Sequence, residues 1–148
     1  MGEGFIKSIY EALRSSPQWN ETLFILTFDE HGGFADHVSP PENVPPGDHR
    51  THKEWALDGS KIEFKFDRLG IRVPTLLMSP WVGKGVVQNR PTNQPNDFTH
   101  TSILKYLSEL WDLPVLTPRV AWSPSFGGLI TTTYRDDTPD KLPEPADF

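Results

Sequence analysis

The chain has 148 residues, a formal net charge of −6 and an isoelectric point near 5.3. Its length suits one domain or part of one, and its acidity argues against a general surface for nucleic acid or anionic membranes. The lack of cysteine excludes disulfides and thiolate chemistry, no apolar stretch reaches the ~20 residues of a membrane helix, and the N-terminus has no secretion-signal pattern.

The first predicted elements are a helix over residues 3–14 and a strand over residues 22–28. Apolar side chains recur in the helix at steps of three and four residues, and the strand contains a continuous apolar run. A helix that leads into a buried strand is half of an α/β repeat, so the predicted fold class is α/β. The apolar side of the helix consists of Phe5, Ile6, Ile9, Ala12 and Leu13, and its charged side of Lys7, Glu11 and Arg14.

Three carboxylates, two histidines and a Gly-Gly pair follow the strand within residues 29–37. Buried strands of α/β sheets present site residues at their carboxyl ends. Asp29 and Glu30 are neighbours, so both can reach one metal ion only if the strand has ended and the backbone turns. Gly32 and Gly33 tolerate the positive φ of such a turn. From the residues alone, metal ligation and a solvated loop both stay open.

The other polar residues of this stretch also have two interpretations each. His31 is a ligand or phosphate donor, or it lies behind the ligands and supports them without binding the metal or the phosphate. Asp36 and His37 form a pair that orients a ligand or transfers a proton. Alternatively, Asp36 caps the turn and His37 packs beneath the proline-rich loop of residues 39–48.

Further elements are predicted along the rest of the chain. Residues 61–66 alternate as a half-exposed strand of an edge hairpin or flap, with a turn at Asp58-Gly59. Residues 72–78 form a second buried strand, with Pro74 at its start or at a bulge. Residues 135–148 form an irregular tail, in which we assign no role to Asp136-Asp137. The sequence also predicts a helix containing Ile103, Leu104, Leu107, Leu110 and Trp111, capped by Asp97 or Thr99, and a short helix around residues 126–130 with Ser123 as its N-cap.

Three more residue types are candidates for contact with a substrate. His100 lies in the first turn of the longer predicted helix, where free amide groups favour anions, or it caps that helix. Arg72 binds phosphate as a fork-shaped donor or pairs with an acid and fixes its strand. Of the tryptophans, Trp55 and Trp81 are the best placed to touch a lipid or aryl group.

Two segments resemble one known family. Residues 29–38, DEHGGFADHV, match the DExxGxxDHV signature of the phosphoesterase family that contains non-specific phospholipases C and acid phosphatases. Residues 70–80, GIRVPTLLMSP, match its second signature, GxRVPxxxxxP. The resemblance implies an alkaline-phosphatase-like fold with a parallel sheet flanked by helices. It also implies metal-assisted cleavage of phosphomonoesters or phospholipids, and a divalent metal ion of unknown identity bound by Asp29 and Glu30.

Members of the resembling family are often secreted, and they carry two upstream motifs that this chain lacks. One resembles ENRSFDH, and the other resembles TxPNR and provides the nucleophile. We therefore interpret residues 1–148 as the C-terminal part of a single phosphoesterase domain, with Asp36, His37 and His100 as supporting catalytic candidates. The expected partners are a phosphate-ester or phospholipid substrate, no nucleic acid, a peripheral lipid surface, and a second copy of the chain bound through an uncovered sheet.

Two other functions stay open. The chain could be a catalytically inactive short product that acts as a binding or interaction protein. It could also be a non-haem iron or zinc enzyme that uses Asp29, His31 and His37 as ligands.

Overall fold

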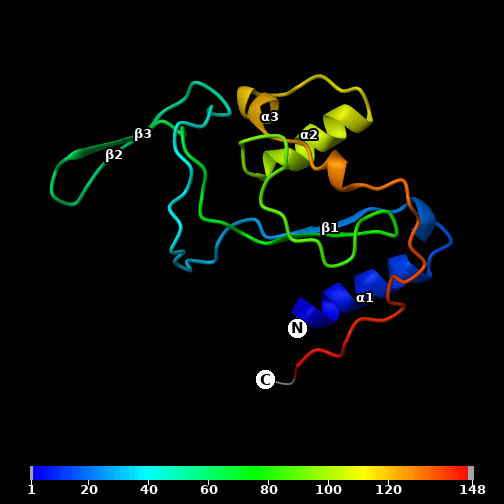
Figure 1. Ribbon diagram of the computed structural model, residues 1–148. Helices are drawn as coiled ribbons and strands as arrows, with labels where there is room; N and C mark the ends of the chain where they lie inside the picture. The colour runs from blue at the N-terminus through cyan, green and yellow to red at the C-terminus, as the bar shows by residue number, and fades with distance from the viewer. Residues whose placement is uncertain (1, 147–148) are drawn as a thin grey trace. The chain divides into compact units, whose positions relative to one another are not determined.

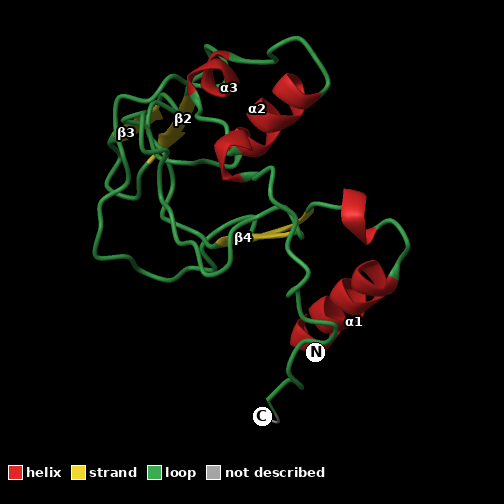
Figure 2. Ribbon diagram, turned by 45° about the vertical axis from the view of Figure 1, so that its right-hand side comes forward, coloured by secondary structure: helices red, strands yellow, loops and turns green. Residues whose placement is uncertain are grey.

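The computed structural model describes residues 2–146, which form a mixed α/β structure rich in loops (Figures 1 and 2). Contacts divide them into two compact units. Unit 1 contains the chain up to Phe28, the segment Pro74–Gly85 and the chain from Leu129 onward, and unit 2 contains Asp29–Val73 and Val86–Gly128. The helices are α1 (Gly2–Ser15), α2 (Thr101–Leu110) and α3 (Pro118–Trp122), and the strands are β1 (Phe24–Thr27), β2 (His52–Trp55), β3 (Lys61–Phe64) and β4 (Thr75–Met78).

All four strands pair antiparallel, in two sheets of two strands. Phe24 of β1 lies opposite Met78 of β4, and Pro74 stands just before β4, as predicted. Both predicted strands are therefore present, but they are less buried than expected: β1 is half-buried throughout, and Thr75 and Leu76 of β4 are exposed. The parallel sheet implied by the resemblance is not seen within residues 2–146.

Unit 1 is organised by α1 and the C-terminal segment. The helix is confirmed, but its most buried residue is Tyr10 rather than a member of the predicted apolar side, and Phe5 is exposed. Tyr10 packs edge to face on Trp19, with ring centroids 5.7 Å apart, and both rings are buried. No helix within the described residues is long and apolar enough to cross a membrane.

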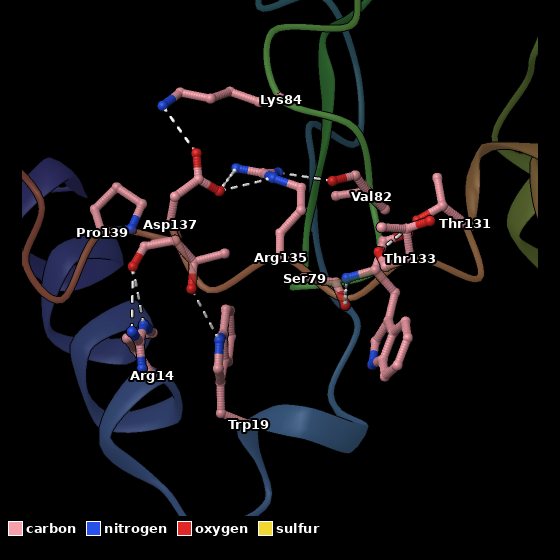
Figure 3. Close-up of polar contacts among 12 residues, drawn as sticks. Arg14, Trp19, Ser79, Val82, Lys84, Thr131, Thr133, Arg135, Asp137 and Pro139 are labelled. Carbon is pink, nitrogen blue, oxygen red and sulfur yellow. Dashed lines mark hydrogen bonds and ion pairs between the residues drawn. The ribbon is translucent and has the colours of Figure 1, made fainter.

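The predicted irregular tail is irregular up to residue 146, and its last two residues lie outside the described residues; its backbone is bonded to the helical part of unit 1 (Figure 3). Arg14 and the Trp19 indole nitrogen donate hydrogen bonds to Thr138, and the Tyr10 hydroxyl donates to the Pro139 carbonyl, 2.7 Å away. Asp137, for which the sequence predicted no role, accepts from Lys84 at 3.0 Å and from Arg135 at 2.8 Å. The polar side of α1 thus binds the chain end.

Unit 2 contains α2, α3 and the hairpin of β2 and β3. The helix α2 and the hairpin were predicted, whereas α3 was not, and Ser123 is the C-cap of α3 rather than the N-cap of a later helix. Only the short 3-10 turn Gly127–Leu129 forms there. Val120 of α3 is 1 % exposed, and Tyr106 of α2 stacks on Phe126 at 4.5 Å.

Candidate functional site

The predicted metal ligands lie in a turn that follows β1 in the sequence. β1 ends at Thr27, and both Gly32 and Gly33 have a positive φ, of 65° and 77°. The strand has therefore ended before Asp29, which is the condition for both carboxylates to approach one ion. Both side chains are exposed.

Each of these two carboxylates has one oxygen bonded to the turn itself. Asp29 Oδ1 accepts the Glu30 amide at 3.0 Å, and Glu30 Oε2 accepts the Gly32 amide at 2.9 Å. These side-chain-to-backbone bonds hold the turn in shape and reduce the rotamer freedom of both side chains. The turn therefore presents two hard anionic oxygen donors, the type that divalent cations prefer.

Asp36 and Arg72 join the two signature segments. Arg72 donates from Nε to Asp36 Oδ2 at 2.6 Å and from Nη2 to Oδ1 at 2.7 Å, in the two-pronged geometry of a strong charge-assisted pair. Oδ1 also accepts the Val38 amide at 3.1 Å. The Arg72 guanidinium, followed by the Val38 amide, holds the pKa of Asp36 well below its usual range. Both the pairing predicted for Arg72 and the turn cap predicted for Asp36 are confirmed.

The three candidate histidines occupy different settings. His31 Nδ1 lies 2.9 Å from the Phe34 carbonyl, so it carries the proton and donates it within the loop. The His37 side chain is 90 % exposed and its Nδ1 lies 3.5 Å from Asp36 Oδ1, so the prediction that it packs beneath the proline-rich loop is wrong. His100 is the N-cap residue of α2, but its side chain makes no capping bond. The Thr99 hydroxyl oxygen accepts the Thr101 amide instead, so Thr99 has the capping role predicted for it.

The other predicted cap residue also has a different partner. Asp97 lies 2.9 Å from Arg90 Nε and does not cap α2. Residues 2–146 contain no cluster of three or more His, Asp or Glu side chains that could hold a metal ion. The proposed set of Asp29, His31 and His37 is therefore not formed. Asp29 and Glu30 have suitable donor chemistry but supply only part of a coordination sphere.

Sequence reasoning missed Arg119, which fixes the loops of unit 2. From α3 it donates to the Pro45 carbonyl at 2.8 Å and to the carbonyls of Phe66 and Arg68. Its partners are main-chain oxygens, so no side-chain pattern in the sequence could have identified them. The Thr117-Pro118 pair just before it is a helix-start signal that could have placed it on a helix.

The aromatic candidates separate clearly. Trp81 is held inside unit 1: its indole nitrogen donates to the Asn20 carbonyl at 2.7 Å and its ring packs on Tyr134 at 5.3 Å. Trp55 is 75 % exposed. A cavity of about 230 Å³ in unit 1 is lined by Tyr10, Trp19, Leu77, Met78, Ser79, Val82, Gly83, Lys84, Gly85, Arg135, Thr138, Pro139 and Leu142, and by none of the candidate site residues.

Comparison with known proteins gives consistent matches. A sequence model described as Phosphoesterase family matches residues 1–114. Non-specific phospholipase C6 of Arabidopsis thaliana is 44 % identical over 98 % of this chain and 28 % of its own length. Non-specific phospholipase C1 of the same plant is 43 % identical over 97 % of this chain and 27 % of its own length. Non-hemolytic phospholipase C of Burkholderia pseudomallei is 29 % identical over 99 % of this chain and 22 % of its own length. The chain thus spans between 22 % and 28 % of the length of these curated relatives.

Proposed function

Because the chain belongs to the Phosphoesterase family, we propose that it forms part of a hydrolase that cleaves a phosphate ester bond of a phospholipid. The match over residues 1–114 carries the proposal, since it includes both signature segments. The relatives described above are phospholipases C, and this supports a phospholipid rather than a soluble phosphomonoester as the substrate. The activity proposed is that of the hydrolase to which this chain contributes.

In this proposal Asp29 and Glu30 bind a divalent metal ion. Phosphoesterases generally depend on metal ions, and such an ion neutralises the phosphate oxygens as they gain charge in the transition state. The turn at Gly32 and Gly33 supports this role, because it leaves both carboxylates exposed on a short, hydrogen-bonded loop. The remaining ligands and the nucleophile are contributed by residues outside this chain.

The histidines and Asp36 have supporting roles in the proposal. Asp36, ionised and bound by Arg72, orients the loop and the neighbouring His37. His37 is exposed and takes part in proton transfer, while His100, at the start of α2, faces the anionic substrate. The chain is part of a single domain of the alkaline-phosphatase-like type, in which further strands complete a parallel sheet.

Metal titration tests the ligand assignment independently of turnover. We expect Mn²⁺, Ca²⁺ or Zn²⁺ titrated into the chain to bind, and Asp29→Asn or Glu30→Gln to weaken binding more than about tenfold, since even residues that only orient a metal ligand are worth that much. Glu21→Gln, which removes another exposed carboxylate, is the control. Equal affinities in all four proteins would contradict the assignment.

Product analysis tests the reaction. Diacylglycerol and phosphate-ester release are measured for the 148-residue chain and for the longest in-frame product of the same gene. We expect turnover by the longer product if it contains a nucleophile motif, and loss of that turnover in Asp29→Asn. Turnover by the 148-residue chain alone would show that its own residues supply the nucleophile.

An inactive binding protein is the second candidate, favoured by the missing nucleophile motif. Metal binding without turnover in every product of the gene would support it. Self-association is part of the same proposal: β1 and β4 pair only with each other among the described strands, so each leaves an outer edge that a second chain could extend. Sedimentation of the chain at several concentrations tests this, and a monomer throughout would contradict it.

A further inference from the structure

The hairpin of β2 and β3 presents apolar side chains at its turn. Trp55 ends β2 and is 75 % exposed, and Leu57 in the turn is fully exposed. The turn is well formed: the Ala56 amide donates to the Ser60 carbonyl at 2.8 Å, the Gly59 amide donates to the Ala56 carbonyl at 2.9 Å, and Gly59 has a φ of 81°. This geometry is typical of a hairpin loop with a left-handed glycine, so the exposed tip is a folded structure.

The base of the same hairpin is packed. The ring centroids of Phe64 and Phe66 are 4.7 Å apart, and the Arg68 guanidinium carbon lies 5.1 Å from the centroid of the Phe64 ring. Arg119 binds the carbonyls of Phe66 and Arg68, and the Val44 amide bonds the Asp67 carbonyl at 2.8 Å. The most exposed apolar residues of the hairpin are therefore at its tip, since Ile62 and Phe66 farther along are only 42 % and 39 % exposed.

Unpaired lysines accompany the tip. Strand register places Lys61 directly opposite Trp55, so these two side chains lie on one face of the hairpin together with Lys53. Within residues 2–146, no ion pair involves Lys53, Lys61 or Lys65, whereas Lys7, Lys84 and Lys105 each have a carboxylate partner.

The acidic residues of the hairpin offset only part of this charge. Glu63 shares the lysine face opposite Lys53, Glu54 lies on the other face beside His52, and the Asp58 carboxylate accepts the Ser60 amide in the turn. Residues 50–68 contain five basic and four acidic residues, against nine and 16 in the rest of the chain. The hairpin is thus a local exception to the acidity of the molecule.

We propose that the tip of this hairpin, Trp55 and Leu57, inserts into the interface of an anionic phospholipid bilayer while Lys53 and Lys61 bind lipid phosphates. Tryptophan favours the boundary between headgroups and acyl chains, and lysine keeps its ammonium group at the headgroup level. Anionic lipids attract basic side chains over a Debye length. Because the molecule as a whole is negatively charged, it needs such basic side chains where it contacts the bilayer. This inference rests on the proposed action on phospholipids.

Vesicle sedimentation tests the apolar part. The chain is mixed with vesicles of phosphatidylcholine alone or of phosphatidylcholine with phosphatidylserine, and the double variant W55A/L57A is compared with Trp111→Ala. Trp111 is 62 % exposed but lies outside the hairpin, so it is the matched control. We expect W55A/L57A to bind the anionic vesicles at least about tenfold more weakly, because the apolar surface that Trp55 and Leu57 would bury in lipid is lost. Trp111→Ala should bind as the unmodified chain does.

The charge part has its own pair of variants. K53Q/K61Q should weaken binding to the anionic vesicles but not to phosphatidylcholine, and added salt should have the same effect. Lys141→Gln removes another lysine that has no ion pair among the described residues, and it should change nothing. Brominated lipid should quench tryptophan fluorescence in the unmodified chain and quench it less in Trp55→Ala.

Several results would overturn the inference. One is no vesicle binding by the unmodified chain, and another is equal binding by W55A/L57A. A third is protection of Trp55 from acrylamide in the longest in-frame product before lipid is added, because the tip would then be covered by protein. Hydrolysis of a soluble short-chain phospholipid by the longest in-frame product is measured alongside. Tip-dependent binding without any hydrolysis would refute the proposed function but support the membrane contact, and hydrolysis without tip-dependent binding would do the reverse.

Discussion

Asp36 is held by three hydrogen bonds, two from Arg72 and one from the Val38 amide. A carboxylate with these partners stays ionised at neutral pH, so it is a poor proton donor and a good orienting group. Its two contacts with Arg72 link the two signature segments, which explains why both can matter to one loop. His37, which is exposed beside it, is the better candidate for exchanging a proton with a substrate.

The Asp36 pair should make the loop sensitive to acid. The pKa of Asp36 is lower in the folded chain than in the unfolded chain, so its stabilisation is complete above about pH 4 and is lost as the pH falls further. We expect the protection factor of the Val38 amide, measured by hydrogen exchange, to decline on acidification. Asp36→Asn should show low protection and no such decline. A decline of equal size in Asp36→Asn would assign it to another group.

Gly33 should resist substitution because of its backbone conformation. Its φ of 77° is unfavourable for a residue with a Cβ, although the space around it is open. We expect Gly33→Ala to lower the free energy of unfolding by about 1 kcal/mol in urea titration. Gly70→Ala, at an equally open position without a positive φ, is the control and should be close to neutral. Equal effects of the two substitutions would mean that the turn is not under this constraint.

At the scale of elements, two similar signals had different outcomes. Thr117-Pro118 begins α3, whereas Ser123-Pro124, which we predicted as a helix start, ends it. Both pairs suit an N-cap followed by a proline, and the choice between them depends on the residues after each proline. Val120 is buried soon after Pro118, while Gly127 and Gly128 disfavour a helix after Pro124. The sequence therefore predicted the kind of boundary but placed it one element too late.

Thr117 should be worth a measurable part of the stability of unit 2. Its hydroxyl oxygen accepts the Val120 amide at 3.2 Å, which satisfies a donor that the short helix α3 leaves open. We expect Thr117→Ala to cost about 1 kcal/mol of unfolding free energy, and Thr117→Ser to cost much less because it keeps the cap. Chemical denaturation gives both values. An equal loss for alanine and serine would assign the effect to the methyl group instead.

Strand positions were predictable from local pattern, but strand partners and burial were not. The apolar run of residues 23–26 and the alternation at residues 61–66 identified β1 and β3, because side-chain period is a local property. Pairing of β1 with β4 joins residues about fifty positions apart, and its direction is set by the whole chain. Two strands alone also leave more surface exposed than a continuous sheet does, so apolar runs that predict burial are only half-buried here.

At the scale of the whole molecule, residues 138–142 stabilise unit 1 although they have no regular structure. Lys7 donates to the Leu142 carbonyl at 2.7 Å, and Arg14 pairs with Asp140 at 2.8 Å in addition to its bonds with Thr138. The acceptors are mainly carbonyl oxygens, which every residue has. Composition could therefore predict an irregular tail but not its attachment. For the same reason we expected Lys7 and Arg14 to face solvent, whereas both bind the C-terminal segment.

Shortening the chain after Asp137 tests this attachment. Without Thr138 and Pro139, the Tyr10 hydroxyl and the Trp19 indole nitrogen lose their hydrogen-bond partners, and two rings that are each 3 % exposed become accessible. We expect faster hydrogen exchange in α1 and a shift of tryptophan fluorescence toward that of a solvated indole. The helix α2 belongs to unit 2, so its exchange should stay unchanged.

A point variant separates attachment from surface charge. Asp140→Asn removes only an ion pair whose acidic side chain is 85 % exposed, and such pairs contribute about 1 kcal/mol or less. It should therefore leave α1 protected, while the shortened chain does not. If both proteins lost protection equally, the ion pair rather than the bonds to Thr138 and Pro139 would hold the segment. If α2 also lost protection, the two units would unfold together, and the stability of the loop carrying Asp29 and Glu30 would then depend on the chain end.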